Sequence, residues 1–241
     1  MAEIRVLDKG FVRLVGSMGG DAGVVEAARV CYGGASKGEE RDRKLIGYLL
    51  EHRHLTPFEH AVLKFHVKCP IFVARQWFRH RFAAYNEISY RYTKTSDEFY
   101  VPEAWRAQDK KNKQGSVESP SLDQRRIHEA FSRSVDLARR TYQEMIEAGV
   151  AREMARMVLP VNVYTEFYWT VNLRSLMNFL SLRADAHAQA EIRRYAEALA
   201  RMFSETCPWS YAAFLGHAWQ GVNPKLDAEK ERLCAPRATA C

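Results

Sequence analysis

Cysteine is scarce in this chain, and none of its five cysteines form a CxxC pair. Zinc sites usually bring cysteines together at such short spacings, so we expect no metal site. An odd number of scattered cysteines is typical of reduced thiols inside a cell. We therefore expect Cys31, Cys69 and Cys207 to be buried and unreactive.

Long apolar runs are also missing. The longest candidate, Val158–Trp169, is interrupted by Pro160, Asn162 and Glu166 and is too short to span a membrane. The first residues, Met1–Lys9, alternate between charged and apolar side chains and lack the apolar stretch of a secretory signal. These observations predict a cytoplasmic protein.

The usual nucleotide-binding and nucleophile motifs are absent as well. The glycine-rich segment Gly16–Gly23 matches neither GxGxxG nor a Walker A motif, so we expect a turn before a helix there. Ser89 is not part of a GxSxG elbow, which argues against a serine nucleophile. No cysteine lies beside the basic residues in sequence. The chain therefore has no obvious nucleophile of its own, and a bound cofactor would have to supply difficult chemistry.

What the chain does have is ordinary globular composition with an excess of positive charge. Its 241 residues are 47% hydrophobic and 27% charged, with a formal net charge of +7. This length is enough for one large core. The charge favours anionic partners, namely nucleotides, phosphates or nucleic acid, without choosing among them.

The hydrophobic pattern predicts an α+β fold, with a mostly antiparallel sheet packed with helices. Alternating apolar residues predict strands at Ala61–Lys68 and Thr165–Val171, and strand-like residues surround a turn at Lys9-Gly10. Period-3.6 patterns and capping signals predict the helices, with Ser121 and Gln124 as a capping box. They cover Val24–Val30, Glu40–His52, Ile71–His80, Ser121–Gly149, Ala151–Leu159, a helix from Leu173, His187–Glu205 and a short one from Pro208. We expect one domain over residues 1–221 and a loose, charged tail over 222–241.

The densest polar stretch is Arg79–Tyr92, RHRFAAYNEISYRY. We expect its end to be part of an extended segment over Ile88–Lys94. Its arginine forks can hold phosphates bidentately, while amide and carboxylate groups can bind the edge of a flat ring. A solvated basic face is the plain alternative, but the strongly apolar residues just upstream favour a site. The polar residues concerned are His54, Gln76, Arg79, His80, Arg81, Asn86, Glu87 and Arg91.

A basic nucleic-acid-binding protein is the main alternative function. Aromatic residues between arginines could stack on bases while the arginines contact phosphates. However, the basic residues are mixed with Asn86, Glu87 and Asn178, and no RRM, KH, helix-turn-helix or zinc-finger pattern is present. A structural protein sharing the fold and a flavoenzyme acting on another nucleotide are further alternatives.

The stretch closely resembles the RHRxxSxNExSxRY motif of the flavin-dependent thymidylate synthases, and the resemblance extends from near Val6 to about Gly221. One motif position differs, because Ala84 replaces the family's first serine. Cys31 also stands where relatives often carry a serine near the flavin. We expect both changes to weaken cofactor contacts without abolishing activity.

The resemblance implies an enzyme that makes dTMP from dUMP, with methylenetetrahydrofolate as carbon donor, FAD as cofactor and NADPH as reductant. It also implies a homotetramer with shared active sites and a non-Rossmann flavin site. The implied FAD-binding residues are His54, Thr56, Arg79, His80, Arg81, Glu87, Asn172, Arg174, Asn178 and His187. The implied dUMP-binding residues are Gln76, Trp77, Phe78, Arg79, Glu87, Ile88, Ser89, Tyr90, Arg91, Arg156 and Arg183.

Arg183 matches the arginine that is thought to polarise the uracil ring in this family, which makes it the implied catalytic residue. In a helix from Leu173, Arg174 and Asn178 share one face, while Arg183 lies about 140° around from Asn178. The two arginines should therefore serve different groups. Arg152 and Arg156 lie four residues apart on a predicted helix, where a solvated pair is the plain alternative to a site.

Overall fold

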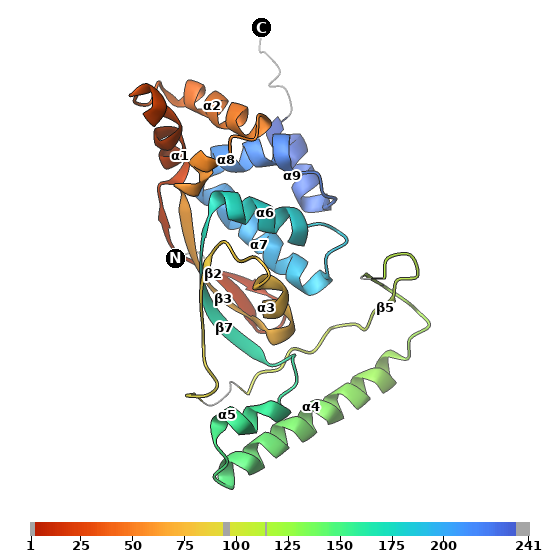
Figure 1. Cartoon of the computed structure of the whole chain (residues 1–241). Coiled ribbons are helices and arrows are strands. Elements are labelled where there is room, and N and C mark those ends of the chain that lie inside the picture. Colours follow the sequence, from red (N-terminus) through yellow and green to blue (C-terminus); the bar gives the residue numbers. More distant parts are fainter. Residues whose placement is uncertain (1–2, 94–96, 114, 235–241) are drawn as a thin grey trace.

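The computed structural model of the chain describes residues 3–93, 97–113 and 115–234. Its centre is a five-stranded sheet in the order β1-β2-β3-β7-β4, in which all neighbouring strands run antiparallel (Figure 1). The strands are β1 (Glu3–Val6), β2 (Gly10–Met18), β3 (Val62–Pro70), β4 (Ala84–Glu87) and β7 (Tyr164–Asn172). The expected α+β class with an antiparallel sheet is confirmed.

The two central strands form because their side chains alternate between apolar and polar. On β3, Leu63, Phe65 and Val67 are fully buried, and β7 contributes Phe167 and Trp169 to the same face. Direct pairs such as Phe65 with Trp169 join the two strands. Burial of this alternating face fixes the register, because a slip by one residue would turn every apolar side chain towards water.

Helices cover the apolar face of the sheet. In Figure 1, α6 (Leu173–Arg183) and α7 (Ala190–Thr206) lie along it, with α3 (Ile71–Trp77) beside them. At one end α1 (Gly20–Arg29), α2 (Glu39–Glu51) and α8 (Pro208–Ala213) pack together. The remaining elements are short or peripheral: η1 (Val30–Tyr32), η2 (Thr56–Glu59), β5 (Ala107–Gln108), β6 (Ser116–Val117), α4 (Gln124–Glu147), α5 (Arg152–Ala155), η3 (Arg156–Val158), η4 (Phe214–Ala218) and α9 (Pro224–Cys234).

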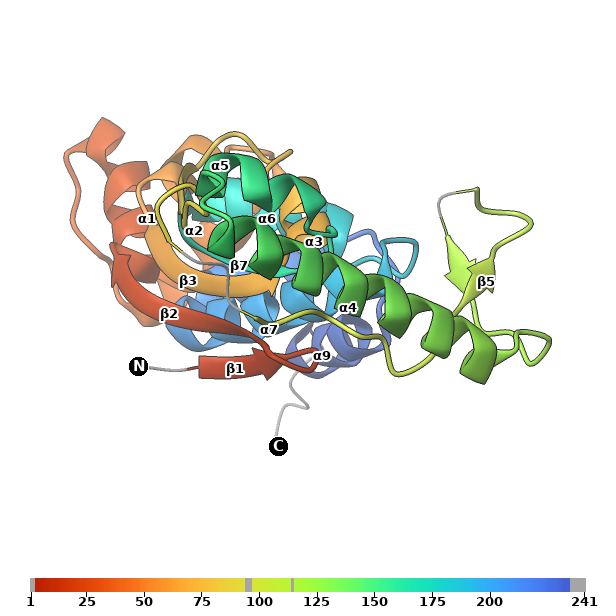
Figure 2. The same cartoon turned by 90° about the horizontal axis from the view of Figure 1, so that it is seen from below.

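The 24-residue helix α4 extends away from this body (Figures 1 and 2). It buries only Val135 and Tyr142, and Val135 packs in a small cluster with Phe99 and Val163. Its N-cap is Asp123, whose side chain accepts a hydrogen bond from the Arg126 backbone at 3.0 Å, so the expected Ser121 capping box is wrong. Gly149, with φ +83°, follows its last turn as expected for a C-terminal glycine.

Other boundaries also differ from the sequence prediction. The turn expected over Gly16–Gly23 is wrong for most of its length, because β2 extends to Met18 and α1 already begins at Gly20. The helix expected over Ile71–His80 ends at Trp77, because the chain must turn there to enter the edge strand β4. The helix expected from His187 begins at Ala190. The segment expected to be extended after Ile88 turns instead, since the Tyr92 backbone N–H donates to the Ser89 carbonyl at 3.0 Å. Lys94 lies outside the described residues.

The expected loose tail is also wrong for its first part. Residues Pro224–Cys234 form α9, and Leu226 is buried in the main core. The Asn223 side chain accepts a hydrogen bond from the Lys225 backbone at 3.0 Å and so caps the helix. Residues 235–241 lie outside the described part. Within the described residues, no helix is long and apolar enough to cross a membrane.

Candidate functional site

The predicted catalytic arginine lies at the end of α6, where it faces the end of α3. Arg183 Nε donates to His80 Nε2 at 3.1 Å, and its Nη2 donates to the Gln76 backbone carbonyl at 3.3 Å. The half-buried guanidinium is thereby held by two neutral acceptors from the residues around the start of the motif. No counter-charge is used to hold it.

His80 is kept neutral in this arrangement. Burial, reinforced by the charge of Arg183, lowers the pKa of His80 to about 4. Because Nε2 accepts the hydrogen bond from Arg183, the ring proton must lie on Nδ1. The histidine can therefore hold Arg183 at neutral pH without repelling it.

Arg79 brings a second positive charge to this place. Burial and the nearby charge of Arg79 both lower the pKa of Arg183, so the two guanidinium groups lie close enough to repel each other. Within the described residues, no carboxylate lies within ion-pair distance of the arginines predicted to bind anionic groups. These are Arg79, Arg81, Arg91, Arg156 and Arg183. Such a group is suited to phosphate or to another anion.

A different situation holds at the start of α6. Arg174 Nη1 contacts Glu59 Oε1 at 2.6 Å, which joins α6 to η2. Thr56, the first residue of η2, and Asn178 are exposed nearby on these two elements, as is His54 just before η2. Asn172 uses its side-chain oxygen to cap α6 through the Ser175 N–H at 2.9 Å. Arg174 and Arg183 contact different residues at opposite ends of α6, while the ligand that each serves stays a prediction.

The third group of predicted residues lies at the end of β4. Glu87 is exposed, and its Oε1 accepts from the hydroxyl of buried Thr165 at 2.7 Å. Ile88 continues the pairing with β7 through the Glu166 carbonyl. Arg91 Nε donates to the Ser89 hydroxyl at 3.3 Å, and Arg81 is exposed before the strand.

The short helix α5 reaches this third group. Arg152 Nη1 donates to the Tyr92 carbonyl at 2.5 Å, which joins α5 to the end of the motif. Arg156 follows on η3, where it is exposed and bonds only the nearby Glu153 carbonyl at 3.3 Å. The two arginines therefore differ, because Arg152 joins two segments whereas Arg156 contacts only its own turn among the described residues.

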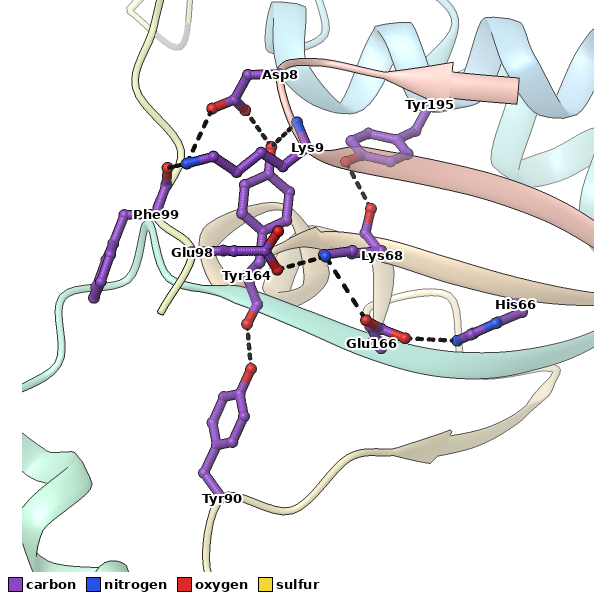
Figure 3. A network of polar contacts seen from close by, with 10 residues as sticks. All are labelled: Asp8, Lys9, His66, Lys68, Tyr90, Glu98, Phe99, Tyr164, Glu166 and Tyr195. Atoms are coloured by element: carbon purple, nitrogen blue, oxygen red, sulfur yellow. Dashed lines mark hydrogen bonds and ion pairs between the residues drawn. The ribbon is translucent and has the colours of Figure 1, made fainter. Parts of the chain in front are cut away.

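Tyr90 is a structural residue at this edge. Its buried hydroxyl donates to the backbone carbonyl of Tyr164 (Figure 3). The Tyr164 hydroxyl in turn donates to Asp8 in the turn between β1 and β2 at 2.5 Å. The motif segment around Ser89 is thus fastened to the opposite edge of the sheet. The Tyr90 side chain is enclosed by protein, so the predicted contact of Tyr90 with dUMP stays a prediction for its backbone.

Trp77 also has a side chain that is enclosed by protein. Its side chain is 0% exposed and makes ring contacts with Phe167, Trp169, Phe179 and Tyr195 at 4.8–5.9 Å between centroids. Its ring is the aromatic centre of the core, so the predicted contact of Trp77 with dUMP stays a prediction for its backbone. The half-buried Phe78 packs edge-on against Phe167 and Tyr85, each at 5.0 Å, so its ring also serves the core.

Comparison with known proteins identifies the family. The profile of the family described as "Thymidylate synthase complementing protein" matches residues 13–209. A flavin-dependent thymidylate synthase of Thermosipho africanus is 54% identical over 221 residues, which are 91% of this chain and 96% of the relative. The chain belongs to the flavin-dependent thymidylate synthase family.

Other relatives agree with this assignment. A flavin-dependent thymidylate synthase of Thermus thermophilus is 55% identical over 91% of this chain and 80% of its own length. The crystal structure of the UMP/dUMP methylase PolB from Streptomyces cacaoi, bound with 5-Br dUMP, superposes with a TM-score of 0.78 at 36% identity. The superposition covers 88% of this chain and 97% of the PolB chain. The predicted family, enzyme class and flavoprotein character are confirmed.

His187 is placed without contradicting its prediction, whereas the expected burial of Cys31 is wrong. His187 precedes α7 and is largely exposed, with Nδ1 2.7 Å from Asp185 Oδ1. Cys31 is exposed, whereas Cys69 and Cys207 are buried as expected. Among the described residues, no group of three or more histidine, cysteine or acidic side chains is arranged to hold a metal ion.

Several residues that hold predicted site residues in place were not themselves predicted from the sequence. Thr165 supports Glu87, Asp185 supports His187, and Gln189 accepts a hydrogen bond from the Gln76 side chain. Each lies outside the motif, and only the fold brings it to its partner. Alternation along β7 could have placed Thr165 on the buried face, but no spacing signal marks the other two.

Proposed function

We propose that this protein methylates dUMP to dTMP, using methylenetetrahydrofolate as carbon donor, FAD as cofactor and NADPH as reductant. The observation that carries the proposal is the group of motif and helix arginines without carboxylate partners, centred on Arg183 and Arg79. The positive charge of these arginines suits small anionic substrates, and both nucleotides and folates are of this kind. A cytoplasmic location suits such substrates.

The residues present fit a flavin nucleotide in their chemistry. Arg79, Arg81 and the motif histidine offer donors for a pyrophosphate, and exposed Thr56, Asn178 and Arg174 offer further polar contacts. Glu87, Asn172, His54 and His187 complete the proposed FAD set. When bound in its reduced form, FAD would supply the hydride. The site would be non-Rossmann, because the sequence has no GxGxxG motif.

For dUMP, the proposed contacts are Gln76, Arg79, the segment from Glu87 to Arg91, Arg156 and Arg183. The exposed arginines would hold the phosphate bidentately. Arg183 is instead half-buried and held by His80 and the Gln76 carbonyl. A fixed cation next to the uracil ring would stabilise negative charge as it develops there, which is the expected role of a preorganised donor.

We further propose that the active sites are shared within a homotetramer. In one chain the predicted residues form three groups, at the ends of α6 and at the end of β4, without a side-chain hydrogen bond between the groups in the described residues. Helix α4 buries only Val135 and Tyr142 in one chain. Light scattering at micromolar concentration should give four times the chain mass, and a monomer that turns over dUMP would refute shared sites.

The central test is anaerobic bleaching of the flavin absorbance by NADPH after FAD is added, with and without dUMP. Bleaching whose rate responds to dUMP supports a shared flavin and nucleotide site. Retained FAD with no response to dUMP would refute the substrate and keep the flavoprotein. Failure to retain FAD would refute the catalytic proposal, and steeply salt-dependent binding to nucleic acid would then support the alternative.

The same assay should include UMP, because the structurally similar Streptomyces cacaoi protein is a methylase of both UMP and dUMP. A preference for dUMP of at least tenfold in kcat/KM is the expected result. Equal turnover of UMP would shift the proposal to a methylase that accepts both nucleotides.

A further inference from the structure

The side chain of Gln76 is held by a residue that the predicted site does not include. Gln76 Nε2 donates to Gln189 Oε1, just before α7. The backbone carbonyl of the same residue accepts from Arg183. Gln76 is therefore fixed at both its main chain and its side chain, although it is one of the proposed dUMP contacts.

Two residues further along, Glu191 anchors this end of α7. Its side chain is only 3% exposed, with Arg106 Nη2 2.7 Å and the Tyr100 hydroxyl 3.2 Å from Oε1. Burial opposes the charge, but hydrogen bonds from Arg106, its own backbone N–H and the Gln189 side chain outweigh burial and lower the pKa of Glu191. The carboxylate is therefore ionised at neutral pH.

An ionised carboxylate can only accept hydrogen bonds. The buried Glu191 Oε2 has no hydrogen-bond partner among the described residues. Of the two polar atoms of the nearby Gln189 amide, only the NH2 group can donate to this carboxylate oxygen. The Gln189 oxygen is then left for Gln76, which must donate its own NH2 group. One buried charge thereby sets the direction of two amides, each of which could otherwise flip.

We propose that Glu191 and Gln189 act as positioning residues that turn the amide oxygen of Gln76 towards the nucleotide site. Gln76 would then accept a hydrogen bond from an N–H donor, as a pyrimidine with a ring N–H can provide. A ligand that offers only acceptors at this place would put its own oxygen or nitrogen lone pairs against the Gln76 amide oxygen and would bind weakly. This inference rests on the proposed binding of dUMP.

The test measures the dUMP dissociation constant of FAD-loaded protein for the wild type, Gln76→Met, Gln189→Met and the double variant. Methionine keeps the shape of glutamine and removes its hydrogen bonds. Gln189→Met should weaken dUMP binding roughly five- to tenfold, the usual scale of one hydrogen bond. In the Gln76→Met background the same change should cost less than about twofold, because the residue it positions is already gone.

A swapped pair provides the rescue. In Gln189→Glu with Glu191→Gln, the new carboxylate still accepts from Gln76, so dUMP affinity should return to within about threefold of the wild type. Gln143→Met is the matched control, because Gln143 bonds Glu147 on the exposed surface of α4 at 2.7 Å. FAD affinity should be unchanged in all variants, and Gln143→Met should also keep the wild-type unfolding midpoint.

The outcomes separate the two proposals. Equal losses from Gln189→Met in both backgrounds, or no loss in either, would overturn the positioning role while leaving dUMP binding intact. A swapped pair as weak as Gln189→Met would also overturn it. If the wild type itself fails to bind dUMP, the proposed function fails and the positioning role with it.

Discussion

The two ends of α6 carry the same residue type in opposite electrostatic situations. Near its start, Arg174 is exposed and paired with Glu59 at 2.6 Å. At its end, Arg183 is half-buried, held by His80 and a carbonyl, and lies near a second arginine. The first arginine has a counter-charge in its own chain, whereas the second has none in the described residues.

This difference indicates how a site is prepared for an anion. A neutral histidine and a carbonyl orient Arg183 without cancelling its charge, so the full charge is available to a ligand. Arg174 must share its charge with Glu59, and an exposed pair of this kind contributes little to stability. The contrast predicts that Arg183 matters for chemistry, while Arg174 adjusts affinity.

The largest expected effect concerns the core under the Arg183 end. Trp77→Ala should lower the free energy of unfolding by about 3–5 kcal/mol, since it opens a cavity among four aromatic rings. Urea unfolding at fixed protein concentration measures this. Phe82→Ala is the control, because Phe82 is 87% exposed and should change stability by less than about 0.5 kcal/mol. Similar small losses in both would show that Trp77 does not support this end.

The next effect separates the two arginines directly. Arg183→Ala should reduce kcat/KM for dUMP by roughly 100- to 1,000-fold, the scale of losing one preorganised donor. Steady-state assays with saturating NADPH and folate measure this loss. Arg152→Ala is the control, because Arg152 also donates to a backbone carbonyl, that of Tyr92, away from Arg183. A loss below tenfold for Arg183→Ala would remove it from the chemistry.

A smaller effect concerns His80 and pH. The pKa of His80 is about 4 in the folded protein and about 6.5 in the unfolded chain, so the unfolded state binds more protons between these values. Stability should therefore fall as the pH drops from 6.5 to 4, by on the order of 1 kcal/mol after allowance for solvent screening. His80→Gln should remove this slope. An NMR titration that places the His80 pKa near 6.5 would contradict this expectation.

The smallest effect tests the paired arginine. Glu59→Gln should change stability by less than about 1 kcal/mol, because the pair is exposed. It should also tighten FAD binding by a few-fold, since Arg174 no longer shares its charge. Fluorescence titration of FAD checks this, with Glu39→Gln as the control for the exposed pair with Arg43. Weaker FAD binding in Glu59→Gln would mean that the carboxylate itself serves the cofactor.

Much of the fold was predictable because buried apolar residues recur in the sequence at the period of the strand or helix that carries them. The strands around Phe65 and Trp169 alternate clearly, so their existence and faces were predicted correctly. The edge strand β4, Ala84–Glu87, was missed because both of its faces are partly wet and its composition does not alternate. The helix α9 was missed because its charged residues suggest a loose tail, although Asn223 and Pro224 are a capping signal.

The candidate site was predictable only through the family resemblance, both within the motif and beyond it. The resemblance supplied Arg183 and Gln76, and the helix period correctly separated Arg183 from Arg174. The resemblance could not reveal that the side chains of Trp77 and Tyr90 point into the protein. It assigns consecutive residues to the site without information on the direction of each side chain. Supports such as Gln189 depend on contacts between distant segments, which no local pattern contains.

The most direct test of the central claim is to measure FAD and dUMP dissociation constants for Arg183→Ala and Arg174→Ala side by side. We expect a crossover. Arg183→Ala should lose dUMP affinity while FAD affinity stays within about threefold of the wild type, and Arg174→Ala should do the reverse, with a smaller change. If each variant loses both ligands to the same degree, the division of the two ends of α6 is wrong.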